Sequence, residues 1–162
     1  MVRLDERDLM ILKVLAREGR ISKADLAKRI NLSTSPAWER LKRLEASGII
    51  DGYRADIALK AVAPHLVVFV TLELERHTPQ DFSRFEALME SRDEITACWA
   101  LGGGFDYLLQ IVTRDLDRYQ SLMEEVLADG PSVARYYTYV VTKPVKAQAP
   151  PPLDVLMQPS DP

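Results

Sequence analysis

Cysteine is almost absent from this chain of 162 residues, since Cys98 is the only one. A single cysteine excludes an intrachain disulfide and argues against a thiolate metal site. Histidine is nearly as scarce: His65 and His77 lie beside and at the end of one expected strand, without a spacing that ligates metal. We therefore expect no metal site and no cofactor.

Long apolar runs are missing as well. No stretch approaches the roughly 20 apolar residues that a helix needs to cross a bilayer. Residues 1–19 are interrupted by Asp, Glu and Arg, which does not fit a secretion signal. We expect a cytoplasmic protein that makes no contact with a membrane.

The net charge of −3 is divided unevenly along the chain. Residues 1–54 hold 12 Lys and Arg against 8 Asp and Glu, a net charge of +4. Residues 55–162 hold 9 against 16, a net charge of −7. A basic first part can contact phosphate while the acidic remainder stays away from it, so this asymmetry favours a nucleic-acid partner.

Residues 22–47 predict two helices joined by a tight turn. Ser22 caps the first helix, with Asp25 three residues on. Asn31 tolerates a left-handed turn, and Ser33 is a good N-cap for the second helix. Pro36 fits only in a first helical turn, where its missing N–H removes no bond.

The second of these helices is amphipathic. Ala37, Leu41 and Leu44 have the spacing of one buried stripe, and Gly48 ends the helix. An earlier helix, which begins at Asp5 and stops by residue 19, completes a trihelical unit. This order predicts a helix-turn-helix whose second helix can lie in a DNA major groove. A pair of amphipathic helices with a solvated basic face is the alternative.

The helix-turn-helix predicts particular DNA contacts. Hydroxyls and N–H groups at the start of the second helix can donate to phosphate. Arg40 and Arg43 are candidates for a base edge or a phosphate, and Lys42 for phosphate alone. We expect Trp38 to pack against the first helix. The predicted DNA-binding residues are Ser33, Thr34, Ser35, Glu39, Arg40, Lys42 and Arg43.

The second half predicts an α+β domain with the order β-α-β-β-α-β. This order is the ferredoxin-like arrangement, one four-stranded antiparallel sheet with two helices on one face. The other face carries more Val, Tyr and Leu than water favours, so we expect a dimer. The expected elements are strands at 65–76, 95–101, 105–113 and 133–142, and helices at 79–91 and 115–128.

Three short segments connect or flank these domains. Asp51 and Gly52 signal a turn, so we expect a small wing or a strand leading away. Residues 102–104, all glycine, are expected to form a turn with positive φ, and they match neither a P-loop nor Gly-x-Gly-x-x-Gly. Six of the ten prolines lie at 144, 150, 151, 152, 159 and 162, which predicts an extended or disordered tail, docking on a neighbour through Leu153, Val155 and Leu156. The expected divisions are a winged helix-turn-helix domain at 1–54, a linker at 55–64, a ferredoxin-like domain at 65–145 and a Pro-rich tail at 146–162.

The chain resembles the Lrp/AsnC, or feast/famine, family of transcription regulators over about residues 4–145. The resemblance combines Arg-Ile-Ser at 20–22 with Leu-Ser…Pro…Glu-Arg-Leu-Lys-Arg-Leu-Glu…Gly-Ile-Ile at 32–50. It continues with Gly-Gly-Phe-Asp-Tyr-Leu-Leu at 103–109 and Thr-Tyr-Val-Val at 138–141. The combination is specific, whereas each motif alone is weak.

The resemblance implies a homodimer formed through the sheet domain, assembling to an octamer with the DNA-binding domains outside. It also implies a small effector, usually an amino acid, bound where two dimers meet. Asp106 keeps a carboxylate that can pair with an effector ammonium, whereas Gly104 replaces an Asp of the family motif. The effector-binding residues carried over are Ala100, Leu101, Gly103, Gly104, Phe105, Asp106, Tyr107, Leu116, Tyr139, Val140 and Val141.

We interpret the chain as a sequence-specific transcription regulator that binds double-stranded DNA and responds to an amino acid. An architectural DNA-binding protein without effector is one alternative. A small metabolite enzyme is another, because ferredoxin-like folds host enzymes. Cys98 is expected within a strand and in the core rather than as a nucleophile, so we do not expect an enzyme.

Overall fold

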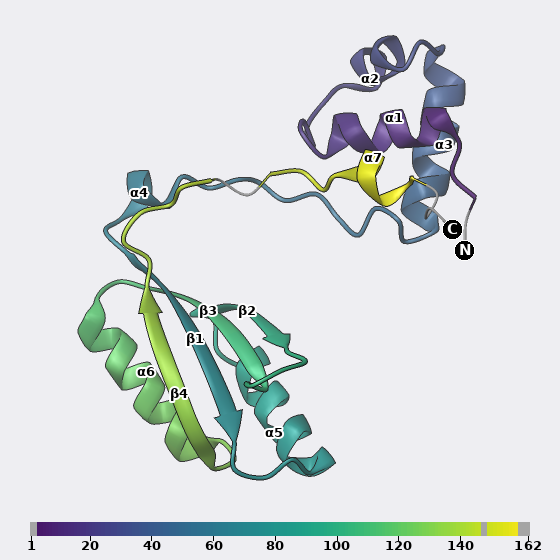
Figure 1. Ribbon diagram of the computed structural model, residues 1–162. Helices are drawn as coiled ribbons and strands as arrows, with labels where there is room; N and C mark the ends of the chain where they lie inside the picture. The colour runs from purple at the N-terminus through teal and green to yellow at the C-terminus, as the bar shows by residue number, and fades with distance from the viewer. Residues whose placement is uncertain (1–2, 147–148, 159–162) are drawn as a thin grey trace. The chain divides into compact units, whose positions relative to one another are not determined.

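The computed structural model describes residues 3–146 and 149–158 (Figure 1). The chain forms two compact units. Of these residues, those up to 57 and those from 146 onwards form one unit, and residues 58–145 form the other. We describe each unit by itself, as the helical unit and the sheet unit.

The helical unit contains the three expected helices, α1 (Glu6–Leu15), α2 (Lys23–Arg29) and α3 (Thr34–Ala46). The caps agree with the sequence: the side chains of Asp5 and Ser22 each accept the N–H of the third helical residue. Asn31 has φ of 52° and Gly48 has φ of 72°, so both adopt the left-handed conformation expected at a helix end. Helix α1 ends four residues before Gly19, earlier than predicted.

One apolar core holds the three helices together. Ile11, Ile30 and Leu44 are fully buried, and each comes from a different helix or its cap. The predicted stripe of α3 is confirmed, because its buried residues are the three expected from the spacing. The buried members of this core are Ile11, Leu26, Ala27, Ile30, Ala37, Leu41 and Leu44.

The segment after α3 leads away from the helices. Residues 51–58 are exposed, and no strand lies between α3 and β1 in the described chain, so the expected small wing is an extended segment. The linker also contains one short helix, α4 (Leu59–Val62).

The Pro-rich tail is not wholly extended. Residues Leu153–Leu156 form a short helix, α7, which corrects the prediction of an extended or disordered segment. The predicted positions Pro159 and Pro162 lie outside the described residues.

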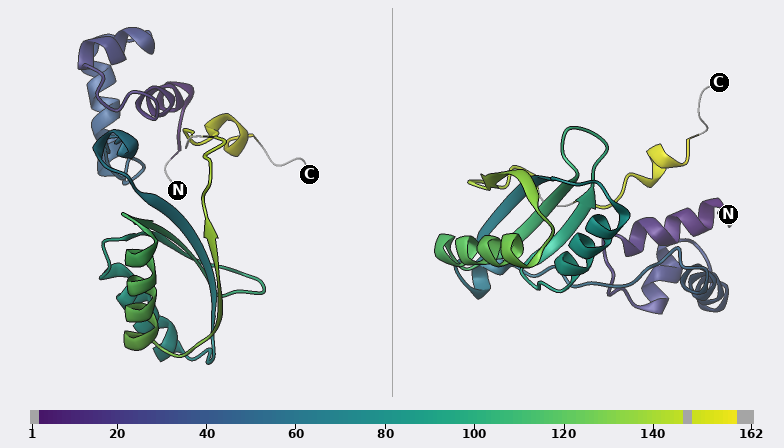
Figure 2. Two further views of the ribbon diagram at one scale, coloured as in Figure 1. Left: turned by 90° about the vertical axis from the view of Figure 1, so that its left-hand side faces the viewer. Right: turned by 90° about the horizontal axis from the view of Figure 1, so that it is seen from below.

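The sheet unit has the predicted βαββαβ order. Its four strands are antiparallel in the order β2-β3-β1-β4, and two helices cover one face (Figure 2). The elements are β1 (Leu66–Leu74), α5 (Pro79–Glu90), β2 (Ile95–Ala100), β3 (Tyr107–Thr113), α6 (Leu116–Asp129) and β4 (Val133–Val140).

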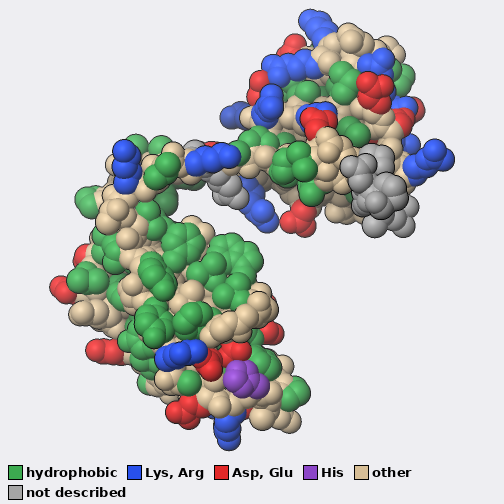
Figure 3. Space-filling view, in the orientation of Figure 1, with side chains coloured by type: hydrophobic (Ala, Val, Ile, Leu, Met, Phe, Trp, Pro, Cys, Tyr) green, Lys and Arg blue, Asp and Glu red, His purple; other side chains and the backbone are tan. Residues whose placement is uncertain are grey.

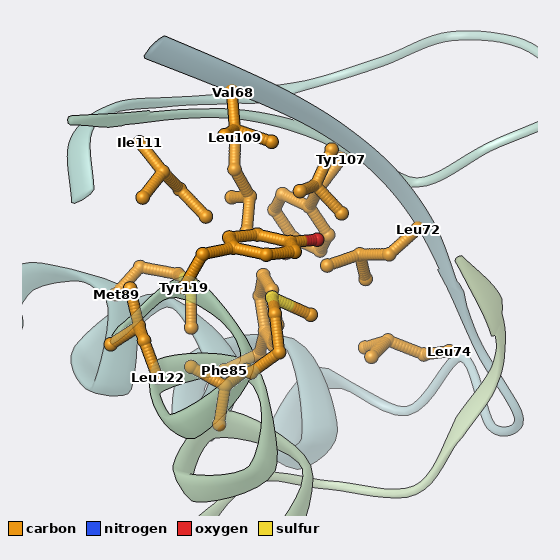
Figure 4. Close-up of a cluster of buried hydrophobic side chains, with 13 residues drawn as sticks. Val68, Leu72, Leu74, Phe85, Met89, Tyr107, Leu109, Ile111, Tyr119 and Leu122 are labelled. Carbon is orange, nitrogen blue, oxygen red and sulfur yellow. The ribbon is translucent and has the colours of Figure 1, made fainter. Parts of the chain in front are cut away.

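The core of this unit lies between the sheet and the two helices. Alternate residues of β1 and β3 point into it, because successive side chains of a strand point to opposite faces. Phe85 of α5 and Leu122 of α6 meet Leu109 of β3 there (Figure 4). The buried members are Val68, Val70, Leu72, Leu74, Phe85, Met89, Tyr107, Leu109, Ile111, Tyr119, Leu122, Met123 and Val126.

The opposite face of the sheet, here called the outer face, is apolar, and no other element of the described residues covers it. Phe69 and Thr71 of β1 pair across the sheet with Tyr139 and Tyr137 of β4. Both tyrosines are about half exposed, as is Trp99 of β2. Hydrophobic side chains therefore gather on this unit in the space-filling view (Figure 3).

Glycine is constrained at position 130 and not at 102–104. None of the three glycines at 102–104 has positive φ, which corrects that prediction, and a Cβ there would meet open space. A Cβ on Gly130, by contrast, would lie 2.7 Å from the carbonyl oxygen of Val126 and 3.2 Å from Leu88. A side chain at position 130 would therefore clash with the last turn of α6.

Replacement of this glycine should be costly. We expect Gly130→Ala to lower the free energy of unfolding by about 1–3 kcal/mol, because the new methyl group forces backbone to move. The matched variant Gly103→Ala should change it by less than about 0.5 kcal/mol. Urea unfolding followed by circular dichroism measures both, and equal effects of the two variants would contradict this packing.

Candidate nucleic-acid interface and effector site

The first turn of α3 is open to solvent. Ser33, Thr34 and Ser35 are exposed, and the Ser33 side chain makes no capping hydrogen bond. The first N–H groups of a helix have no intrahelical partner, and the helix dipole makes this end positive. The hydroxyls and N–H groups at this end are therefore placed to bind a phosphate.

Two lysines flank the indole of Trp38. Nζ of Lys23, from α2, lies 3.4 Å from the ring centroid, and Nζ of Lys42 lies 5.5 Å from it. Trp38 itself packs partly buried against the helical core. The sequence predicted that Trp38 packs in the core. It did not predict the second role of this residue, which is to hold two cations beside the exposed start of α3.

Arg40 and Arg43 are turned toward α1 rather than left free. Nη1 of Arg40 lies 2.6 Å from Asp5 Oδ2 and 2.9 Å from Asp8 Oδ1. Nη2 of Arg43 lies 2.6 Å from Asp8 Oδ2. The Asp8 side chain is only 1% exposed, whereas those of Arg40 and Arg43 are 29% and 52% exposed. We call these four residues the arginine clamp.

The arginine clamp also closes the start of α1. The Asp5 N–H donates to Asp8, and the Asp8 N–H donates to Asp5, which is a reciprocal capping box. The Asp8 N–H and the Arg40 guanidinium lower the pKa of the Asp5 carboxyl, and the two carboxylates raise the pKa of Arg40. Asp5 and Arg40 therefore stay ionised at neutral pH, and the clamp fixes α3 on α1.

Loss of the buried carboxylate should loosen the helical unit. We expect Asp8→Ala to lower the free energy of unfolding by about 2–4 kcal/mol, because Arg43 loses its carboxylate partner, Arg40 keeps only Asp5, and the N-cap N–H loses its acceptor. The control Asp51→Ala removes a carboxylate that is 90% exposed, 3.7 Å from Arg54, and should cost less than about 1 kcal/mol. Chemical denaturation measures both, and a small loss in Asp8→Ala would rule out a structural role for the clamp.

In the sheet unit, Asp106 braces the turn before β3. Its Oδ2 accepts the N–H of Leu74 at 2.8 Å, and both carboxylate oxygens lie 3.1 Å from Nε2 of His77. Its backbone N–H donates to the Leu72 carbonyl, and its carbonyl accepts from Leu101. The carboxylate therefore has internal partners, and its side chain is 18% exposed.

The aromatic residues on either side of Asp106 lie in different places. Phe105 packs edge-to-face on Tyr137, with 5.6 Å between ring centroids, and Arg135 lies over its ring at 5.2 Å. Tyr107 is buried in the core instead, 4.6 Å from Phe85 between ring centroids. The predicted effector turn thus supplies one aromatic residue to the β4 surface and one to the core.

A cavity of about 330 Å³ lies between α5, β2 and the start of β3. The Tyr107 hydroxyl lines this cavity and donates a hydrogen bond to Glu86 at 2.8 Å. Burial raises the pKa of Tyr107. Burial and Glu86 also raise the pKa of Cys98 to about 11, so the thiol stays protonated at neutral pH, partly buried as expected. The lining residues are Glu86, Met89, Glu90, Ile95, Cys98, Ala100 and Tyr107.

Sequence reasoning placed Ala100 and Tyr107 at the effector site and missed the two glutamates of this cavity. Glu86 and Glu90 are spaced i, i+4 on α5, which puts both on one helix face. This spacing is the feature of the sequence from which the pair could have been predicted.

The remaining predicted effector residues are exposed, except Val141, which is half-buried. Leu116 is 50% exposed at the start of α6, and Tyr139 and Val140 are 54% and 45% exposed on β4. Tyr139 pairs with Phe69 on the outer face, whereas Val140 pairs with the buried Val68. Neighbours on a strand point to opposite faces, so Tyr139 and Val140 serve different surfaces.

The described residues hold no group of three or more His, Cys, Asp or Glu side chains arranged to bind a metal ion. None of their helices is both long and apolar enough to cross a membrane.

A helix-turn-helix with an open, cationic helix start, joined to a ferredoxin-like sheet unit, defines a two-domain DNA-binding regulator. Two family models match the chain: "Winged helix-turn-helix DNA-binding" over residues 4–51, and "Lrp/AsnC ligand binding domain" over residues 67–151. The chain belongs to the Lrp/AsnC family of transcription regulators, which confirms the resemblance stated from the sequence.

Similar proteins support the same assignment. The transcriptional regulatory protein DoeX of Halomonas elongata is 46% identical over 145 residues, which cover 90% of this chain and 92% of that protein. The leucine-responsive regulatory protein of Salmonella typhimurium is 41% identical over 143 residues, 88% of this chain and 87% of its own. A transcriptional regulator from Neisseria meningitidis, solved in complex with L-methionine, has a TM-score of 0.88 at 32% identity and covers 96% of this chain and all of its own.

Proposed function

We propose that this regulator binds specific DNA sequences through α3 and changes that binding when an amino acid occupies the sheet domain. The observation that carries the proposal is the open start of α3 beside Lys23 and Lys42, which combines helix N–H groups, hydroxyls and cations on one surface.

The arginine clamp divides the predicted DNA contacts into two groups. We propose that Arg40 and Arg43 position α3, because both already bind Asp8. The residues proposed to face DNA are the exposed ones outside the arginine clamp, Ser33, Thr34, Ser35, Glu39 and Lys42.

Lys42 should act as a phosphate contact. We expect Lys42→Ala to weaken binding equally on DNA from upstream of the protein's own gene and on random DNA of equal length. The slope of log K against log salt should fall by about 1. Fluorescence anisotropy at several salt concentrations measures this, with Lys60→Ala in the linker helix as the control. An unchanged slope would show that Lys42 contacts no phosphate.

For the effector, we propose an amino acid held between dimers near the turn at Asp106. The support is the matched ligand-binding domain and the L-methionine bound by the similar Neisseria protein. The proposed contacts are Ala100, Leu101, Gly103, Gly104, Phe105, Asp106, Tyr107, Leu116, Tyr139, Val140 and Val141. When the effector binds, its ammonium group would replace His77 as the partner of the Asp106 carboxylate.

That exchange can be tested by thermal unfolding with L-methionine and with a mixture of amino acids. We expect ligand to raise the Tm of the protein, and Asp106→Asn to abolish the rise, since the amide still accepts from Leu74 but carries no charge. His77→Gln keeps the carboxylate and should keep the rise. A full rise in Asp106→Asn would exclude the carboxylate as the ammonium partner.

We also propose that the outer face of the sheet joins two copies into a dimer, and that dimers assemble to an octamer. Burial of half-exposed Trp99, Tyr137 and Tyr139 would stabilise such a dimer.

The proposal includes the remaining expectations: domains at residues 1–54 and 65–145 joined by a linker, a cytoplasmic location and no catalytic activity. The relatives are transcription regulators, which supports this reading.

One observation favours a second candidate function. Asp106 is bonded within its own domain and Gly104 supplies no carboxylate, which suits an architectural DNA-binding protein without effector. Tight DNA binding that shows no preference for the upstream sequence and no response to amino acids would favour this candidate over the regulator.

A further inference from the structure

The C-terminal tail contacts the helical unit. Lys13 of α1 forms an ion pair with Asp154 of α7. Leu153 is partly buried, whereas the remaining described tail residues are exposed. Leu153 and Pro151 line a cavity of about 270 Å³ with Leu12, Leu15, Ala16, and residues 49–54. Helix α7 lies beside α1 in Figure 1, as the ion pair requires.

Helix α7 lies outside the residues that the two family models match. They cover residues 4–51 and 67–151, so α7 falls beyond both.

We propose that residues 149–157 are a reversible strap that ties the end of β4 to the DNA-binding unit of the same chain. Strand β4 ends at Val140 and α7 begins at Leu153, so twelve residues connect them. An extended chain spans at most about 3.3–3.6 Å per residue, so these twelve residues reach at most roughly 40 Å. With the linker before β1, it gives the two units a second connection and limits how far they separate and rotate.

The contact suits a strap that opens and closes. Lys13 and Asp154 are 40% and 74% exposed, and ion pairs between exposed side chains are weak. The contact persists because the tail is tethered, which keeps its effective concentration near the helical unit high.

The strap leaves the proposed DNA surface open. No residue of α3 lines the cavity that holds Leu153. Docking therefore restricts the orientation of the DNA-binding unit without covering its recognition helix.

The chain that leads into the strap starts at the proposed effector contacts, because Tyr139, Val140 and Val141 lie at the end of β4 and just after it. A ligand that orders these residues would act on the origin of the strap, a step that rests on the proposed function. The docking itself requires neither ligand nor DNA.

Hydrogen exchange of the full chain tests the strap. A helix of four residues is not stable alone, so protection of the Val155, Leu156 and Met157 amides reports docking. We expect Lys13→Glu, which leaves the tail sequence unchanged, to raise their exchange roughly two- to fivefold. Lys28→Glu, the same charge change on α2, should leave it unchanged, and the swapped pair Lys13→Glu with Asp154→Lys should restore protection.

Two results would overturn the proposal. Equal exchange in the protein and in Lys13→Glu would show that the ion pair does not hold the tail. Restored protection on co-refolding Lys13→Glu chains with Asp154→Lys chains would show that the tail docks on a second copy, because only contacts between different chains regain opposite charges. Neither result would affect the proposed DNA or amino-acid binding, which this experiment does not use.

Discussion

The buried carboxylate of Asp8 organises the DNA-binding unit. It receives the Asp5 N–H and guanidinium groups from Arg40 and Arg43, so it caps α1 and holds α3 with the same two oxygens. A buried acid is costly unless charged donors surround it, and the two arginines meet that need. The orientation of α3, and with it the exposed helix start, depends on this group. The cations proposed to bind phosphate are then the lysines beside Trp38.

In the sheet unit, successive side chains of each strand point to opposite faces. One face therefore stabilises the core and the other is available for interactions. One set of β1 side chains packs against α5 and α6, and the other set forms the apolar outer face. The turn at Asp106 lies at the edge between these faces, with Phe105 on the side of Tyr137 and Tyr107 in the core. A ligand bound at this turn would therefore lie next to the outer face, which is proposed as the dimer surface. It would also lie next to Tyr107, which packs against α5.

Most of the fold could be predicted from the sequence because local signals agree with it: the caps at Asp5 and Ser22, the left-handed Asn31, and the apolar alternation of residues 66–74. The contacts within the candidate site could be predicted less well from the sequence. Arg40 and Arg43 have the spacing of DNA contacts, and only the position of α1 reveals that Asp8 holds them. Composition predicted an extended tail, but contacts with residues distant in sequence decide that α7 forms.

The most direct test of this account is the distance between the Arg40 guanidinium and the Asp8 carboxylate in a structure of the protein bound to its upstream DNA. The account predicts that the two groups remain within hydrogen-bond distance while Ser35 and Lys42 contact the DNA. A structure in which Arg40 leaves Asp8 and binds a base edge, or in which α3 does not face the DNA, would contradict it.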